Sequence, residues 1–259
     1  FIGGGIESKP ALKHSKSLGY ENILIDKDVN CPSKEFCDYF IPSSVYDHQK
    51  AIILLRKLNI DFHGVLCVAT DASITLAQIC NEFSLNGPTI SSAEVLTDKI
   101  LMKEVFKKEN LPIPNFQEVK SISDIKIFLS SYDKAVLKPS DNRGSRGVFI
   151  LTSDLSESQL TDFYKESKSL SSSKKVIIEE FLEGDQLSTE SIVNNSKAYT
   201  IGISDRNYSR LAEFYPRIIE DGGDLPSKYI YLKKEIDRLV QNVSDTLGLD
   251  YGVLKGDLV

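Results

Sequence analysis

The chain has 259 residues, of which 41% are hydrophobic and 26% charged, a composition that excludes disordered and collagen-like proteins and indicates a packed globular one. Its 31 basic and 37 acidic residues leave a net charge of −6. This balance argues against nucleic acid as the main ligand, because phosphate-backbone binding needs a concentrated basic surface. No run approaches 18 consecutive apolar residues, so we expect no transmembrane helix and no membrane partner.

The ends and the cysteines indicate the setting. The sequence starts at Phe1 and stops at Val259 inside a predicted strand, so we expect a fragment trimmed at both ends. The four cysteines form no C-x-x-C pair, and their spacing fits neither a zinc site nor a disulfide scaffold: they are Cys31, Cys37, Cys67 and Cys80. We therefore expect a reduced, cytoplasmic protein.

The first 95 residues alternate short apolar runs with helical patterns. Strands are predicted at 23–26, 38–41 and 85–88, a buried run at 64–69, and helices at 8–18, 47–58 and 72–83. This alternation predicts a parallel, doubly wound sheet that is covered on both faces.

After residue 96 the pattern changes. Thr97 and Asp98 offer a helix start, and a helix over 99–109 ends before Pro112. Strands at 116–119, 134–138, 148–151 and 176–181 and helices at 123–132 and 156–168 then predict a small α+β domain. Strands at 187–193, 198–204 and 249–259 and a helix at 231–247 complete the chain.

The opening glycines could belong to a dinucleotide site. Gly3 and Gly5 fit the first two positions of G-x-G-x-x-G, and Asp26 lies about 20 residues further on. Ser8 stands in place of the third glycine. We favour the simpler interpretation, in which the glycines only allow a tight strand-to-helix turn, and NAD binding stays open as the alternative.

A second motif follows the strand at 134–138. Lys138 ends this apolar strand, and a glycine loop follows it with two arginines and a hydroxyl at Arg143, Gly144, Ser145, Arg146 and Gly147. Backbone N–H groups of such a loop can cradle phosphate oxygens while a lysine neutralises their charge. About 39 residues upstream, Lys99 lies in the first turn of the linking helix, a position where a solvated lysine is the commoner case.

A third motif is an apolar strand that ends in acids, Val176-Ile-Ile-Glu-Glu-Phe-Leu-Glu-Gly184. A carboxylate there can accept a hydrogen from the adenine amino group, and the following backbone can pair with the edge of the ring. A plain strand with a polar end is the alternative.

These three motifs, in this order, resemble the ATP-grasp superfamily, and most closely its carboxylating and carbamoyl-phosphate-synthase-like members. The resemblance implies an α/β protein with a parallel-sheet pre-ATP-grasp domain at 1–95 and a linking helix at 96–114. An α+β lid subdomain at 115–182 and an incomplete α+β C-terminal subdomain at 183–259 would then form the ATP-grasp fold.

The resemblance also implies roles for the nucleotide-binding residues. Lys99 and Lys138 match the two lysines that hold the ATP phosphates. The loop at 143–147 matches the one that closes over the triphosphate, with Ser145 and Gly147 binding and with Arg143 and Arg146 joining Lys138 in catalysis. Glu179 matches the acceptor from adenine N6. Three residues match the hinge beside the ring: Glu180, Phe181 and Leu182.

Two further sites follow from the same resemblance. Gln186 stands where a ribose-binding acid is usual, and Glu190 could substitute for it. Asp257 resembles the first Mg²⁺ carboxylate, and the second would lie beyond Val259. Three arginines could bind an anionic substrate or be ordinary surface residues: Arg206, Arg210 and Arg217.

The implied activity is an ATP- and Mg²⁺-dependent ligase for a small carboxylate (or bicarbonate) and an amine. The carboxylate would take the γ-phosphate as an acyl phosphate, and the amine would displace it. We expect the fragment itself to be inactive, and a homodimer is common among proteins that it resembles. Three alternatives stay open: a biotin-carboxylase-type enzyme, an NAD-dependent oxidoreductase using Gly3, Gly5 and Asp26, and a non-catalytic nucleotide-binding module.

Overall fold

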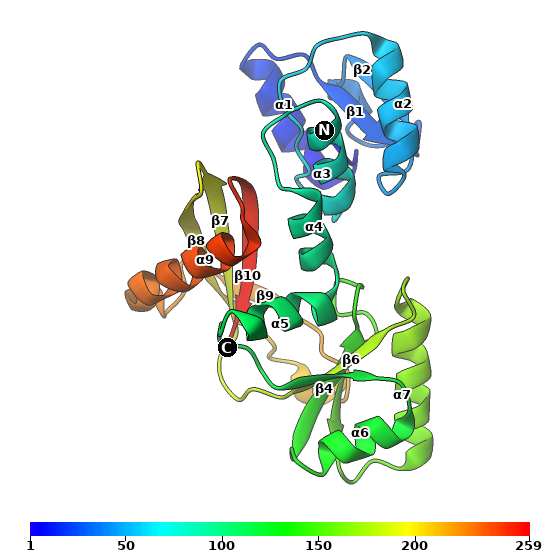
Figure 1. The fold of residues 1–259 in the computed structure, drawn as a ribbon, viewed down its shortest axis with the longest axis vertical. Helices are drawn as coiled ribbons and strands as arrows, with labels where there is room; N and C mark the ends of the chain where they lie inside the picture. The colour runs from blue at the N-terminus through cyan, green and yellow to red at the C-terminus, as the bar shows by residue number, and fades with distance from the viewer. The chain divides into compact units, whose positions relative to one another are not determined.

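The computed structural model describes residues 1–259, which form two compact units (Figure 1). The first unit contains residues 1–94 and 249–252, and the second contains residues 95–248 and 253–259. None of the helices is both long enough and apolar enough to cross a membrane.

The first unit is built on a short parallel sheet. Its elements are α1 (Lys9–Ser17), β1 (Ile23–Asp26), β2 (Tyr39–Pro42), α2 (His48–Leu58), α3 (Ser73–Glu82) and the start of α4 (Ile90–Thr97). Strands β1 and β2 pair in parallel, and Ile2 adds a parallel bridge to Ile25. Neighbouring side chains of a strand point to opposite faces, so Leu24 packs against Leu12 of α1 while Ile25 packs against α2 and α3. The predicted parallel sheet with two covered faces is confirmed.

Two predictions in this unit are wrong. The run at 64–69 is not buried throughout, because only Val65 and Cys67 pack on the core, while Leu66 and Val68 are 55% and 52% exposed. The segment at 85–88 is not a strand. There the Leu85 N–H donates to the Cys80 carbonyl and closes the last turn of α3, so the segment serves as a helix end, and α4 follows it.

The second unit begins with α5 (Lys99–Lys108), which Asp98 caps by accepting from the N–H groups of Ile100 and Leu101. A four-stranded antiparallel sheet follows, in the order β3-β6-β4-β5. Its strands and the two helices that cover it are β3 (Phe116–Val119), α6 (Ile122–Leu129), β4 (Lys134–Pro139), β5 (Phe149–Thr152), α7 (Glu157–Leu170) and β6 (Val176–Glu180). We call these four strands the lid sheet.

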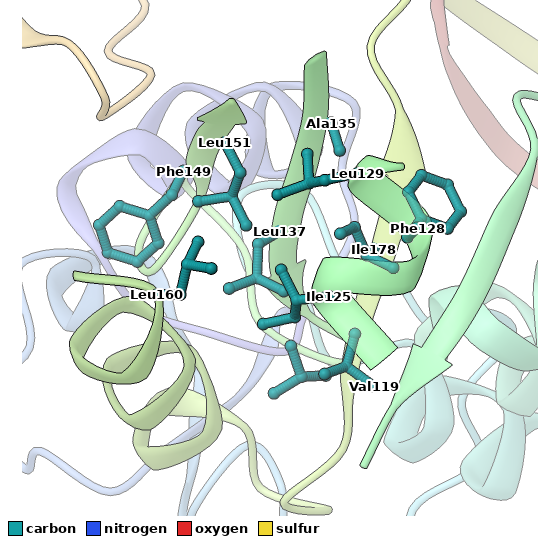
Figure 2. Close-up of a cluster of buried hydrophobic side chains, with 11 residues drawn as sticks. Val119, Ile125, Phe128, Leu129, Ala135, Leu137, Phe149, Leu151, Leu160 and Ile178 are labelled. Carbon is teal, nitrogen blue, oxygen red and sulfur yellow. The ribbon is translucent and has the colours of Figure 1, made fainter. Parts of the chain in front are cut away.

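One face of the lid sheet forms an apolar core. Figure 2 shows Leu137 of β4, Leu151 of β5 and Ile178 of β6 facing Ile125 of α6 and Leu160 of α7. All five side chains are at most 3% exposed. Serine capping boxes at Ser121 and Ser156 start both helices.

A second sheet has the order β10-β7-β8-β9. Its strands are β7 (Leu187–Asn194), β8 (Lys197–Asn207), β9 (Gly222–Asp224) and β10 (Tyr251–Leu258), with α8 (Leu211–Phe214) before β9 and α9 (Lys233–Leu247) packed on β8. Short 3₁₀ helices lie at Ile6–Ser8, Lys34–Phe36 and Ile230–Leu232. The sequence patterns did not predict α4, α8 or β9. The last two have no periodic apolar pattern, and β9 forms only by pairing with the end of β8.

The loop between β4 and β5 turns on two glycines with left-handed backbone. Gly144 has φ +67° and Gly147 has φ +74°. A Cβ on Gly144 would meet open space, whereas a Cβ on Gly147 would lie 2.9 Å from Leu170 Cδ1 and 3.4 Å from Ser167 Cα. The Ser167 hydroxyl also donates to the Gly147 carbonyl at 2.7 Å. The second glycine therefore fixes the end of the loop against α7.

These two glycines make a matched pair for a stability test. Both Gly144→Ala and Gly147→Ala suffer the strain of a positive φ, which costs about 1 kcal/mol. Gly147→Ala also creates a clash, so we expect it to lower the free energy of unfolding by about 1–3 kcal/mol more than Gly144→Ala. Urea denaturation measures both values, and equal losses would contradict the packing role of Gly147.

Candidate functional site

The candidate site lies on the lid sheet face opposite the apolar core and is centred on Glu179 of β6. Val136 of β4 pairs directly with Glu179, and Lys138, two residues further on, projects from the same face. The Lys138 ammonium lies 2.8 Å from Glu179 Oε2. Glu179 is 5% exposed, and its other oxygen, Oε1, is buried without a hydrogen-bond partner.

A second lysine, absent from the sequence prediction, reaches the same carboxylate. Lys103 of α5 places its ammonium 3.4 Å from Glu179 Oε2 and is 7% exposed. Burial lowers the pKa of Lys103, and the nearby Glu179 works to raise it. One signal could have found it: Lys103 lies four residues after Lys99, on the same side of a helix.

Lys99 joins the cluster from the first turn of α5. Its backbone N–H donates to the Ser140 carbonyl at 2.8 Å, and its ammonium donates to the Asn142 carbonyl at 2.7 Å. Burial, followed by repulsion from the Lys138 ammonium, lowers the pKa of Lys99 to about 8. Three amines thus gather around one carboxylate, which favours an anionic ligand.

The glycine loop borders this cluster. At its start, the Asp141 carboxylate accepts from the N–H groups of Ser172 and Ser173 at 3.1 and 2.8 Å. In its middle, the Arg146 guanidinium folds back and donates to Asn142 Oδ1 at 3.2 Å. Ser145 has φ +54° and is half-buried. The loop is therefore anchored at both ends.

The predicted hinge after β6 has its side chains already engaged. Glu180 Oε2 accepts from the Asn115 amide at 2.8 Å. The Phe181 N–H donates to the Lys134 carbonyl at 3.3 Å, and the Lys134 ammonium lies 5.4 Å from the centre of the Phe181 ring. Leu182 is 39% exposed. A role of this segment in binding the base would therefore rest on its backbone.

The remaining predicted binding residues lie in or directly before strands of the second sheet. The Gln186 carbonyl accepts from the Arg206 N–H at 2.8 Å, and Glu190 pairs with Lys255 at 3.3 Å. Asp257 pairs with Arg206 Nη1 at 2.8 Å. The structure thus brings Lys99, Lys138 and Glu179 together. It places Glu190 on β7, Asp257 on β10 and Gln186 directly before β7.

The predicted magnesium ligand, Asp257, is paired with an arginine that has a second acidic partner. Arg206 also pairs with Glu220. Burial works to lower the pKa of Arg206, but Glu220 and Asp257 raise it above its usual range. No group of three or more His, Cys, Asp or Glu side chains in the chain could hold a metal ion by itself. Mg²⁺ usually takes only one or two carboxylates together with water and phosphate oxygens, so Asp257 stays a predicted ligand.

The other two arginines are also charge-compensated. Arg210 pairs with Glu213 at 2.6 Å. Arg217 pairs with Glu166 of α7 through two bonds of 2.7 and 2.9 Å. Neither arginine is a ready site for an anionic substrate.

The opening glycines serve packing. A Cβ on Gly3 would lie 2.1 Å from Thr70 Oγ1, and one on Gly4 would lie 2.5 Å from Cys31 Sγ. Both oxygens of Asp26 already accept backbone N–H groups, from Gly4 at 2.7 Å and from Asp28 at 2.9 Å. These contacts favour the simpler interpretation over NAD binding.

Comparison with known proteins shows what the chain is similar to. A family model described as the ATP-grasp (A) domain of phosphoribosylglycinamide synthetase matches residues 97–219. The uncharacterized protein y4rH of Sinorhizobium fredii (strain NBRC 101917 / NGR234) is 26% identical over 196 residues, which are 75% of this chain and 40% of that protein.

Two solved structures share the fold over 99% of this chain at 16% identity. The L-amino acid ligase from Bacillus licheniformis has a TM-score of 0.76 with 61% of its chain covered, and the N5-carboxyaminoimidazole synthetase from Staphylococcus aureus, complexed with ADP, has 0.76 with 64% covered. The chain therefore spans less than two thirds of each of these relatives. Residues 97–219 thus match an ATP-grasp domain model, and the whole chain shares its fold with these two enzymes.

Proposed function

We propose that the protein containing this chain is an ATP-dependent ligase that joins a small-molecule carboxylate to an amine. The observation that carries the proposal is the gathering of Lys99, Lys103 and Lys138 around buried Glu179, beside a glycine loop. The ligase and synthetase names of the similar proteins support the same reaction class.

The residues fit ATP in two respects. The unpartnered Oε1 of Glu179 is a buried acceptor, and a buried polar atom without a partner costs free energy until a donor reaches it. The amino group of adenine is such a donor. Lys99 and Lys138 carry the positive charge that a polyphosphate needs.

Each residue has a proposed task in catalysis. Bound ATP supplies the phosphoryl group that activates the substrate carboxylate. Lys138, with Arg143 and Arg146 of the loop, neutralises charge on the transferred group, since catalysis of phosphoryl transfer consists mainly of positioning and electrostatic stabilisation. Closure of the lid, proposed as residues 115–182, would exclude water and protect the activated carboxylate.

Other parts of the proposal rest on the resemblance alone. The C-terminal subdomain at 183–259 would supply Gln186 or Glu190 to the ribose, and Asp257 to Mg²⁺. Mg²⁺ would take its remaining ligands from water and phosphate oxygens. A homodimer and a cytoplasmic location stay predictions.

Nucleotide binding is the first test. We expect the full-length protein to bind ATP and ADP in the presence of Mg²⁺, and Lys138→Ala to weaken both about tenfold or more, because a charge-assisted contact to phosphate is lost. Isothermal titration calorimetry measures both affinities. Lys126→Ala, which removes an exposed lysine paired with Glu157 on the lid, is the matched control. Absence of nucleotide binding by the wild type would overturn the proposal.

The reaction class has its own test. With a panel of carboxylates and amines, we expect ADP and phosphate release to depend on a carboxylate. If the carboxylate is labelled with ¹⁸O, one labelled oxygen should appear in the released phosphate, because the carboxylate oxygen attacks phosphorus. Mass spectrometry of the phosphate detects it. Nucleotide binding without carboxylate-dependent ADP formation would indicate a binding module.

The lowered pKa of Lys99 predicts a pH dependence. An ammonium binds phosphate and a neutral amine does not, so ADP affinity should be highest below pH 8 and fall as pH rises through the Lys99 pKa of about 8. Calorimetry between pH 7.5 and 9.5 in steps of about half a unit measures the decline, whose limit for one proton is about tenfold per unit. Lys99→Arg keeps its charge and should flatten the decline. A wild-type affinity that is constant over this range would contradict the role of Lys99.

A further inference from the structure

Lys103 lies in the site, but its side chain is too deeply buried for direct contact with the phosphates of a nucleotide. Its ammonium comes from α5, reaches Glu179 Oε2 at 3.4 Å, and has a side chain only 9% exposed. Lys138 comes from β4, reaches the same oxygen at 2.8 Å, and is 22% exposed. Lys138 can therefore contact a ligand, whereas Lys103 is held against the Glu179 carboxylate.

Both cations act on one oxygen and leave the other without a partner. If charge neutralisation alone were needed, a single lysine would balance Glu179. Two ammonium groups, from α5 and β4, instead pair with Oε2, so the position of that oxygen is constrained. Oε1 is then the oxygen that remains buried and unsatisfied, directed as an acceptor for a neutral N–H donor.

We propose that Lys103 is a positioning residue for Glu179. Together with Lys138 it holds Glu179 Oε2, so that Oε1 can accept a hydrogen bond from the amino group of a purine. Lys103 thereby sets the selectivity for 6-amino over 6-oxo purine nucleotides. The inference rests on the proposed nucleotide site and deepens it. It separates two effects of Lys103: its charge favours every nucleotide equally, while its hold on Glu179 favours only a base that has an amino group.

The test compares ATP with ITP, whose base has an oxygen where adenine has the amino group. We measure the affinity of the full-length protein for both nucleotides by calorimetry with Mg²⁺, in the wild type, Lys103→Met, Lys103→Gln and Lys103→Arg. Lys108→Met, which replaces an exposed lysine on the same helix, is the control. Thermal melting reports whether each variant is folded, and the Gln variant serves if the Met variant is not.

The wild type should prefer ATP over ITP by about tenfold or more, the value of a hydrogen bond to a charged group. Lys103→Met and Lys103→Gln should weaken ATP about tenfold and ITP less than about threefold, so that the preference collapses. Lys103→Arg should restore most of the preference, and Lys108→Met should leave it unchanged.

The contrary outcomes are distinguishable. If the folded Met or Gln variant weakens both nucleotides equally and keeps the preference, Lys103 is only a charge in the site, and this inference is wrong while the proposed function stands. If the wild type binds ATP and ITP with equal affinity, Glu179 does not recognise the amino group of the base. This inference is then also wrong, and the proposed function stands. If the wild type binds neither, both proposals fall.

Discussion

The site depends on the constraint that a buried carboxylate needs counter-charges. Glu179 lies on the central part of the lid sheet, where a lone ionised carboxylate would cost several kcal/mol. Lys138 and Lys103 offset that cost through one oxygen. These two ion pairs connect α5 and β4 to β6. The pairs that offset the cost of burying the carboxylate therefore also position α5, the helix that carries Lys99.

The lid sheet separates stability from chemistry by its two faces. Because side chains alternate along a strand, Leu137 and Ile178 enter the apolar core while their neighbours Lys138 and Glu179 enter the charged site. Burial lowers the pKa of Lys99 most, and repulsion from the Lys138 ammonium lowers it further. A polyanion would relieve this repulsion, so the unliganded site is arranged for binding at some expense of its own stability.

Local patterns predicted much of this arrangement, and long-range contacts account for the rest. The strands at 23–26 and 116–119 were predicted with their observed bounds. The first contains the apolar run Ile-Leu-Ile, and the second is a short segment that starts just after Pro114. Lys103 was missed because a helical lysine looks solvated until Glu179, 76 positions away, is folded against it. The strand β9 was missed for a similar reason, since Gly222–Asp224 becomes a strand only beside β8.

The contacts of Arg217 have a consequence for association. Strand β5 is an edge of the lid sheet, and an open edge is a template for a strand from another chain. Here the Pro216 carbonyl accepts from the Ile150 N–H at 2.7 Å, and Arg217 fastens this segment to Glu166 of α7 while its guanidinium lies 4.9 Å from the centre of the Phe149 ring. The segment after α8 therefore caps the edge and protects the sheet from intermolecular strand addition.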